Sequence, residues 1–150
     1  MLRTEDMELL PEDHPLLHRK AKRIARIDDT VRNIAAAMID VMEKNNGIGL
    51  AASQVGILKQ IIVVLVKDKP VVMINPEIID ISKEYCDMEE GCLSFPGQYL
   101  KIERPQRVKV KYRALSGHPV IEWYENLEAR CILHEIDHLD GVVFLDRIDT

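Results

Sequence analysis

Two histidines four residues apart, His134 and His138, constrain this chain more than any other feature of its sequence. At that spacing both imidazoles lie on one face of a helix, one turn apart, so that they can reach a single metal ion with Glu135 carried beside them. The pattern H-E-x-x-H is typical of zinc-type hydrolysis. A catalytic site of this kind usually has three protein ligands and one open position, so the fold has to bring a third ligand to this helix.

Length, charge and hydropathy narrow the possible classes of protein. The 150 residues, 47% of them hydrophobic, fit one catalytic domain covering residues 1–150. The net charge is -5 and the basic residues are scattered, which disfavours nucleic acid as a direct ligand. No apolar run approaches the about 20 residues that span a bilayer, and residues 1–12 lack the pattern of a signal peptide. We therefore expect a soluble cytoplasmic protein without a membrane segment.

Hydrophobic periodicity predicts where the helices and strands lie. Apolar residues recur every three or four positions through 28–44, which predicts a helix begun by Asp28 or Asp29 and ended at 45–47. The β-branched run 61–66 predicts a buried strand, followed by a turn at 67–70. Further strands are predicted at 71–74, 77–81, 84–89, 99–103, 107–114 and 119–123, with a turn at 116–117 between the last two and a short final strand at 142–145.

The order of these elements predicts the fold class. Asn126 is expected to cap the metal-binding helix and Gly141 to end it. Residues 1–27, interrupted by Pro11 and Pro15, are interpreted as an irregular arm packed on the domain surface. Because helices and strands do not alternate regularly, we predict an α+β fold in which mixed, mainly antiparallel sheets pack around the central H-E-x-x-H helix, with one further long N-terminal helix.

The third metal ligand is expected upstream of the helix. In the longer signature H-E-x-x-H-x-x-G-x-x-H a third histidine would stand where this chain has Phe144. Cys92 is the preferred candidate, because it lies in the glycine-containing stretch 89–97, where a thiolate would face a pocket. The weaker alternatives are His14, His18 and His118.

The three cysteines do not form a disulfide framework. Their number is odd and their spacing is not that of a small secreted scaffold. The alternative role for Cys92 is that of a small buried hydrophobe, which is the usual fate of a free cysteine, and Cys86 and Cys131 are interpreted in that way.

A third stretch, 47–56, is rich in small residues. Its glycines and alanines allow another chain to approach the backbone closely, and Gln54 offers an uncharged amide donor. The stretch alone is a weak signal, because a helix end followed by a small-residue packing contact would look the same.

Taken together, three segments resemble the motifs of the peptide deformylases in order and spacing. Residues 47–54 resemble G-φ-G-φ-A-A-x-Q, residues 90–94 resemble E-G-C-φ-S, and residues 134–138 resemble the H-E-x-x-H motif. The resemblance implies a hydrolase that removes the formyl group from the N-formylmethionine of newly made polypeptides. It also implies one divalent metal ion, natively Fe²⁺, held by Cys92, His134 and His138. A thiolate ligand is also compatible with Zn²⁺, Ni²⁺ or Co²⁺.

The resemblance and the chemistry together assign catalytic roles. A bound divalent ion lowers the pKa of a water toward neutrality, and Glu135 as general base can take its proton and return it to the departing amine. By resemblance, the Gln54 amide and the Leu93 backbone N–H stabilise the charge that develops on the formyl oxygen.

The resemblance also implies how the substrate binds. The nascent peptide is expected to add as a short strand near Ile48 and Gly91, with its methionine side chain in an apolar pocket. The residues expected around this peptide and pocket are Gly47, Ile48, Gly49, Glu90, Gly91, Leu127, Cys131 and His134. Glu90 is expected to orient Gln54 or a loop backbone group. Arg104 and Asp137 are expected to pair behind the ligands, with a solvated Asp137 as the alternative.

The remaining expectations concern binding partners, positions that depart from the family's sequence pattern, and competing functions. We expect a monomer that meets nascent peptides close to the ribosome. Leu133 and Tyr99 stand where the family often has glutamine and arginine, and the sequence ends at Thr150 without the long C-terminal helix of many bacterial members. The alternatives are a catalytically silent relative that binds formyl-peptides or keeps a structural metal, and, less favoured, an endopeptidase using the same helix.

Overall fold

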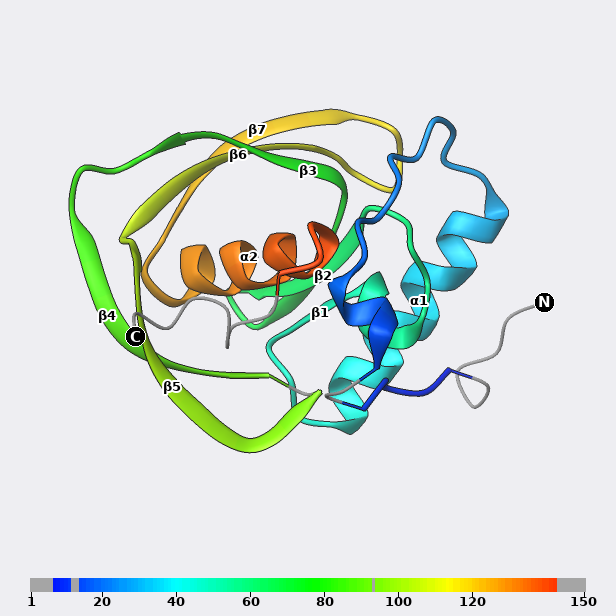
Figure 1. Cartoon of the computed structure of the whole chain (residues 1–150). Helices are drawn as coiled ribbons and strands as arrows, with labels where there is room; N and C mark the ends of the chain where they lie inside the picture. Colours follow the sequence, from blue (N-terminus) through cyan, green and yellow to red (C-terminus); the bar gives the residue numbers. More distant parts are fainter. Residues whose placement is uncertain (1–6, 12–13, 93, 143–150) are drawn as a thin grey trace.

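The protein combines two antiparallel sheets with two helices, as the α+β prediction requires. The computed structural model describes residues 7–11, 14–92 and 94–142. Strands β1, β2, β3, β6 and β7 form one sheet in that order, and β4 pairs with β5 in a second sheet of two strands. Helix α2 lies at the centre, with strands on several sides, whereas α1 lies on the opposite side of β1 and β2 (Figure 1). The elements are α1 (Asp29–Lys44), β1 (Gly49–Ala51), β2 (Ile61–Val66), β3 (Lys69–Ile81), β4 (Tyr85–Cys92), β5 (Phe95–Pro105), β6 (Arg107–Arg113), β7 (Pro119–Glu125) and α2 (Asn126–Leu139), with short 3₁₀ turns η2 (Pro15–His18) and η3 (Ala52–Val55).

Strand β2 is continuously apolar because both of its faces are buried. Ile61 and Val63 pack into the core beneath α1, and alternate residues Ile62 and Val64 pack into a second core beneath α2. Since successive side chains of a strand point to opposite faces, a strand between two helical layers cannot show an apolar and polar alternation. This arrangement holds α2 firmly against the sheet.

The strands predicted between residues 61 and 123 are present, but their boundaries differ. The predicted strands 71–74 and 77–81 are one strand, β3, which continues through two register irregularities. Asn75, with a φ of 53°, and the following proline interrupt the sequence pattern without ending the strand. The turn before β3 is also tighter than predicted, because Lys67 and Asp68 both have positive φ and alone connect Val66 to Lys69.

The prediction for the start of α2 was wrong, and that for its end is confirmed. Asn126 is not the N-cap: it lies within the helix with a φ of 57°, and its backbone N–H donates to the carbonyl of Gln106. At the other end Gly141 has a φ of 77° and donates to the His138 carbonyl, while Val142 donates to that of Asp137. These paired bonds are a Schellman end, which favours glycine. Val142 is not in a strand, and the rest of the predicted strand 142–145 lies outside the described residues.

The N-terminal arm is irregular, as predicted, but it does not lie only on the surface. Met7, Leu17, Ala21 and Ile24 are buried. The Ala21 N–H donates to the carbonyl of Leu139 over 2.7 Å, so the arm runs beside the end of α2. Prolines prevent regular structure in this segment but do not prevent its apolar side chains from joining the core. Within the described ranges, no helix is both long and apolar enough to span a membrane.

Candidate metal centre

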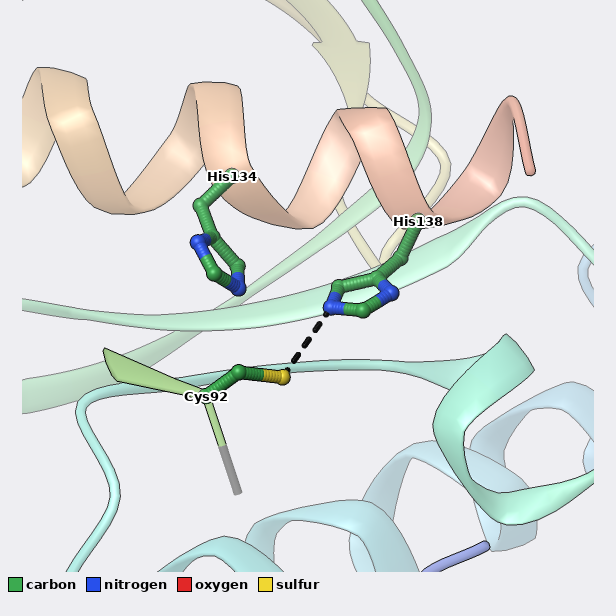
Figure 2. Close-up of side chains that lie close together, drawn as sticks. All are labelled: Cys92, His134 and His138. Carbon is green, nitrogen blue, oxygen red and sulfur yellow. Dashed lines mark hydrogen bonds between the residues drawn. The ribbon is translucent and has the colours of Figure 1, made fainter. Parts of the chain in front are cut away.

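Three side chains from two elements converge where the H-E-x-x-H helix meets the end of β4. Cys92 ends β4, and His134 and His138 lie on one face of α2 (Figure 2). The thiol sulfur and one nitrogen of each imidazole all lie within 4.8 Å of one another. The Cys92 Sγ lies 3.3 Å from His138 Nε2. The preferred third ligand is thus brought to the two histidines by the fold.

Among the described residues, none of the alternative ligands belongs to this group of ligand atoms. His14 accepts a hydrogen bond from the Leu16 N–H at the start of η2, and His118 lies in the connection between β6 and β7. His18 lies in η2 and does not belong to the group of ligand atoms described above.

The donor set fits a divalent transition-metal ion. One soft thiolate and two imidazoles suit iron, zinc, nickel and cobalt, and three protein ligands leave a position for substrate or water. One buried polar atom of the residue next to His134, Glu135 Oε1, has no hydrogen-bond partner among the described residues. Buried polar atoms normally have a partner, so the site is built to receive a polar group or water.

Glu90 orients His134. Its Oε1 lies 2.9 Å from His134 Nδ1, which leaves the Nε2 of that ring available to a metal ion. A carboxylate on the far nitrogen of a metal-binding histidine fixes the ring and makes it a stronger ligand. The expected contact of Glu90 with Gln54 or a loop backbone group is not present among the described residues, where the carboxylate contacts His134, Arg104 and Arg130 instead.

The predicted pair between Arg104 and Asp137 is present. Arg104 Nη1 donates to Asp137 Oδ2 over 2.8 Å, and both residues are buried, so Asp137 is not a solvated carboxylate. The same guanidinium donates two further hydrogen bonds to Glu90. Burial raises the pKa of Glu90, but hydrogen bonds from His134 and Arg104 outweigh it and lower that pKa to about 2. Glu90 is therefore a carboxylate throughout the physiological pH range.

The two imidazoles differ in pKa because their neighbours differ. Burial lowers the pKa of both, but hydrogen bonds with Cys92 and Glu90 raise that of His134 to about 10. Burial and the nearby charge of His134 lower the pKa of His138 to about 3. His138 is thus neutral, the form that binds metal, whereas a metal ion has to displace a proton from His134.

Gln54 is held with its amide nitrogen toward the candidate site. Its Oε1 accepts a hydrogen bond of 2.9 Å from the Ala51 N–H, and its Nε2 donates to Cys92 Sγ over 3.3 Å. Because the carbonyl end is occupied by backbone, the amide cannot turn around without losing that bond. The small-residue stretch therefore delivers a fixed N–H donor to the site.

Gly49 allows α2 to pack directly on β1. A Cβ built at Gly49 would meet the Cys131 sulfur and would lie 2.7 Å from Glu135 Oε2. Cys131 is buried, as predicted, and its thiol donates to the Ile48 carbonyl over 3.2 Å. Burial raises the pKa of Glu135 to about 7. At Gly49 the small-residue stretch thus allows the close approach of α2, whereas the predicted approach of another chain stays a prediction.

The other predicted site residues are placed as follows. Ile48 and Leu127 are 46% and 49% exposed, unusually high values for large apolar side chains near a buried site. Gly91 lies on β4 directly before Cys92. Leu93 lies outside the described residues. Cys86 is only half-buried, which departs from its interpretation as a buried hydrophobe.

Sequence reasoning missed Arg130. This arginine is buried and donates to Glu90 and to two backbone carbonyls. It lies four residues before His134, and that spacing places both residues on one face of α2. An arginine on the ligand-bearing face of a buried helix was a usable signal, because such a charge needs a buried partner.

Comparison with known proteins identifies the family. The sequence model of the family described as polypeptide deformylase matches residues 7–150. The chain belongs to the polypeptide deformylase family. A peptide deformylase of Synechocystis sp. is 48% identical over 140 residues, which cover 90% of this chain and 75% of that protein.

Solved structures of deformylases share the fold. The peptide deformylase of Thermotoga maritima is 42% identical with a TM-score of 0.93, covering 96% of this chain and 98% of that one. The Synechococcus elongatus deformylase, solved in complex with actinonin, is 44% identical with a TM-score of 0.92, covering 96% of this chain and 79% of that one. The resemblance seen in the three motifs is confirmed, and the chain is an enzyme of a metal-dependent hydrolase family.

Proposed function

We propose that this protein removes the formyl group from N-formylmethionyl nascent peptides and releases formate. The observation that carries the proposal is the convergence of Cys92, His134 and His138 within 4.8 Å, in a chain of the deformylase family. Gln54 donates to Cys92, and Glu135 lies close enough to His134 for its charge to act on that imidazole. We propose that residues 1–150 form one catalytic domain that works as a monomer in the cytoplasm, close to the ribosome.

Cys92, His134 and His138 would hold one divalent ion, for which Fe²⁺ is the proposed native metal, and Zn²⁺, Ni²⁺ and Co²⁺ fit the same donors. When bound, the ion supplies Lewis acidity to a water molecule and to the formyl carbonyl. Glu90 would keep the His134 ring aimed at it, and Arg104 with Asp137 would brace the two elements behind the ligands.

Glu135 would act as general acid and base. It follows His134 directly, and burial raises its pKa to about 7, close to the working pH that suits a group both taking and giving a proton. Its carboxylate would take the proton of the attacking water and deliver it to the amine that departs from the formyl carbon. Its Oε1, without a partner among the described residues, is available for that role.

Gln54 would stabilise the developing oxyanion. Its amide nitrogen is already fixed toward the site by the Ala51 hydrogen bond, so it needs no reorganisation during the reaction. The Leu93 backbone N–H is the second proposed donor. Loss of one such donor typically costs about 10²- to 10³-fold in rate.

The substrate would bind along an open sheet edge. Strand β1 is at the end of its sheet and pairs with β2 on one side, and Gly47, Ile48 and Gly49 lie at this edge. A peptide adding there as a strand would be bound through backbone hydrogen bonds, which tolerate many sequences. On the other side it would pass Glu90 and Gly91, with Leu127 and Cys131 beside the methionine.

The decisive experiment measures formate released from formyl-Met-Ala-Ser by protein loaded with Fe²⁺ in the absence of oxygen. We expect formate release by the wild type and a loss of at least about 10²-fold in kcat for Glu135→Gln, which cannot accept the proton. Glu128→Gln, on the first turn of the same helix, is the matched control and should retain activity.

Three outcomes would contradict the proposal. A fully metal-loaded wild type that releases no formate above background would reject deformylation. Cleavage of a peptide bond in the same substrate would favour an endopeptidase. A metal ion closed off by a fourth protein ligand would favour a silent relative with a structural ion.

A further inference from the structure

Arg130 reaches three separate points of the β4–β5 hairpin from the central helix. Its Nη1 donates to Glu90 Oε2 over 2.6 Å and to the Ile102 carbonyl over 2.7 Å, and its Nη2 donates to the Cys86 carbonyl. Cys86 and Glu90 belong to β4, and Ile102 belongs to β5. One planar guanidinium thus fixes both strands of the hairpin to α2.

These contacts matter because the two sheets are separate. Strands β4 and β5 are hydrogen-bonded to each other and not to the larger sheet in the described part of the chain. Cys92 is carried by the smaller sheet, while His134 and His138 are carried by the helix that packs on the larger sheet. The position of the thiol relative to the imidazoles therefore depends on what joins the hairpin to α2.

Arg130 also acts on His134 through Glu90. Glu90 Oε2 accepts from Arg130, while Oε1 accepts from Arg104 and lies against His134. Holding the carboxylate at two oxygens restricts its rotation, and the carboxylate in turn fixes the imidazole.

We propose that Arg130 is a positioning residue of the metal centre, which sets the distance between Cys92 and the two histidines and the orientation of His134. The inference rests on the proposed metal site. It predicts that removal of the guanidinium loosens the bound ion even where the fold survives. The fold should survive, because Glu90, the carboxylate that Arg130 contacts among the described residues, still pairs with Arg104.

The test uses Co²⁺ as the probe and measures its release into an excess of chelator, together with the visible d–d spectrum of the loaded protein. Arg130→Met keeps the apolar stem and removes every donor, and Arg130→Lys keeps the charge but cannot make all three contacts. Arg32→Met is the matched control, because Arg32 is an exposed arginine in a surface pair with Asp29 on α1.

We expect Arg130→Met to release Co²⁺ about 10- to 100-fold faster than wild type, with a changed d–d spectrum. The rate of Co²⁺ release from Arg130→Lys should lie between those of wild type and Arg130→Met. The rate from Arg32→Met should match that of wild type. Wild-type release and spectrum in Arg130→Met, with only a lower melting temperature of the metal-free protein, would overturn the inference. Failure of both Arg130 variants to fold would also overturn it, since Arg130 would then serve folding alone.

The outcome is independent of deformylation. A wild type that binds Co²⁺ but releases no formate would defeat the proposed function and leave the comparison of Co²⁺ release intact. Normal formate release by the wild type with unchanged Co²⁺ release by Arg130→Met would defeat the positioning role alone.

Discussion

Gly49 illustrates at the scale of one residue how Glu135, the proposed general base, is placed. The side chains of Cys131 and Glu135 occupy the space where a Cβ of residue 49 would be. Helix α2 therefore approaches β1 more closely than any other amino acid at position 49 would allow. The Glu135 carboxylate of α2 can therefore occupy its position only because residue 49 of β1 has no Cβ.

Gly49→Ala is therefore expected to damage catalysis more than metal binding. The new methyl group should push Glu135 aside, and a displacement of about 1 Å can cost about 100-fold in rate. Overpacking should also reduce the free energy of unfolding by about 1–3 kcal/mol. Formate release gives kcat, and metal content is measured on the same sample.

The matched control adds Cys131→Ala, which removes the sulfur nearest to the new methyl group. The double variant should be more active than Gly49→Ala, and Cys131→Ala alone supplies the baseline, because Cys131 is itself proposed to lie beside the methionine of the substrate. Full activity in Gly49→Ala would show that Glu135 is not held by this contact.

The residues of the candidate site were predictable from sequence to different degrees. Histidine spacing on a helix and the presence of a cysteine in a glycine-containing stretch pointed to the group of Cys92, His134 and His138 that the structure brings together. The partner of Glu90 could not be predicted, because a carboxylate binds whichever donors the fold brings to it. Here these donors come from two arginines and His134, at positions 104, 130 and 134.

At the scale of elements, one asparagine fastens the N-terminal arm to β3. The Asn75 side chain accepts from the Ile24 N–H and donates to the Ile24 carbonyl, both over 2.8 Å. With a φ of 53°, Asn75 also allows the bend at which β3 changes register. The pattern of apolar residues revealed the strands but not this connection, because polar contacts between distant segments leave no periodicity in the sequence.

Asn75→Gly is expected to separate these two contributions. Glycine tolerates the positive φ but leaves both backbone groups of Ile24 without their partner, and each such buried group costs about 1–3 kcal/mol. Urea unfolding should show that loss of stability for Asn75→Gly. Asn46→Gly, at an exposed position with a similar φ of 54°, is the control and should keep the stability of the wild type. Equal stability of Asn75→Gly and wild type would mean that the arm is held by its buried side chains alone.

At the scale of the whole molecule, the metal ion should join parts of the fold that the chain leaves separate. Cys92 and the two histidines belong to different layers, so an ion bound to all three stabilises the folded state alone. At a free ion concentration 100 times the Kd, ion binding raises the free energy of unfolding by about 2.7 kcal/mol. For a domain of this size the melting temperature should rise by about 5–10 °C.

Melting curves with Zn²⁺ and with a chelator measure this stabilisation. In Cys92→Ala the difference between the two conditions should shrink strongly, because one ligand is lost. A wild type whose melting temperature is the same with ion and with chelator would show that the three side chains do not hold a metal together.

The central position of α2 has a consequence for the order in which this protein can be made. The helix is the last of the described elements, yet it fills the middle of the fold and carries two of the three proposed ligands. During synthesis, β1 to β7 leave the ribosome before the helix that they surround, and such contacts between distant segments form slowly. An enzyme proposed to process nascent chains therefore cannot assemble its own site until His138 has emerged from the ribosome that is making it.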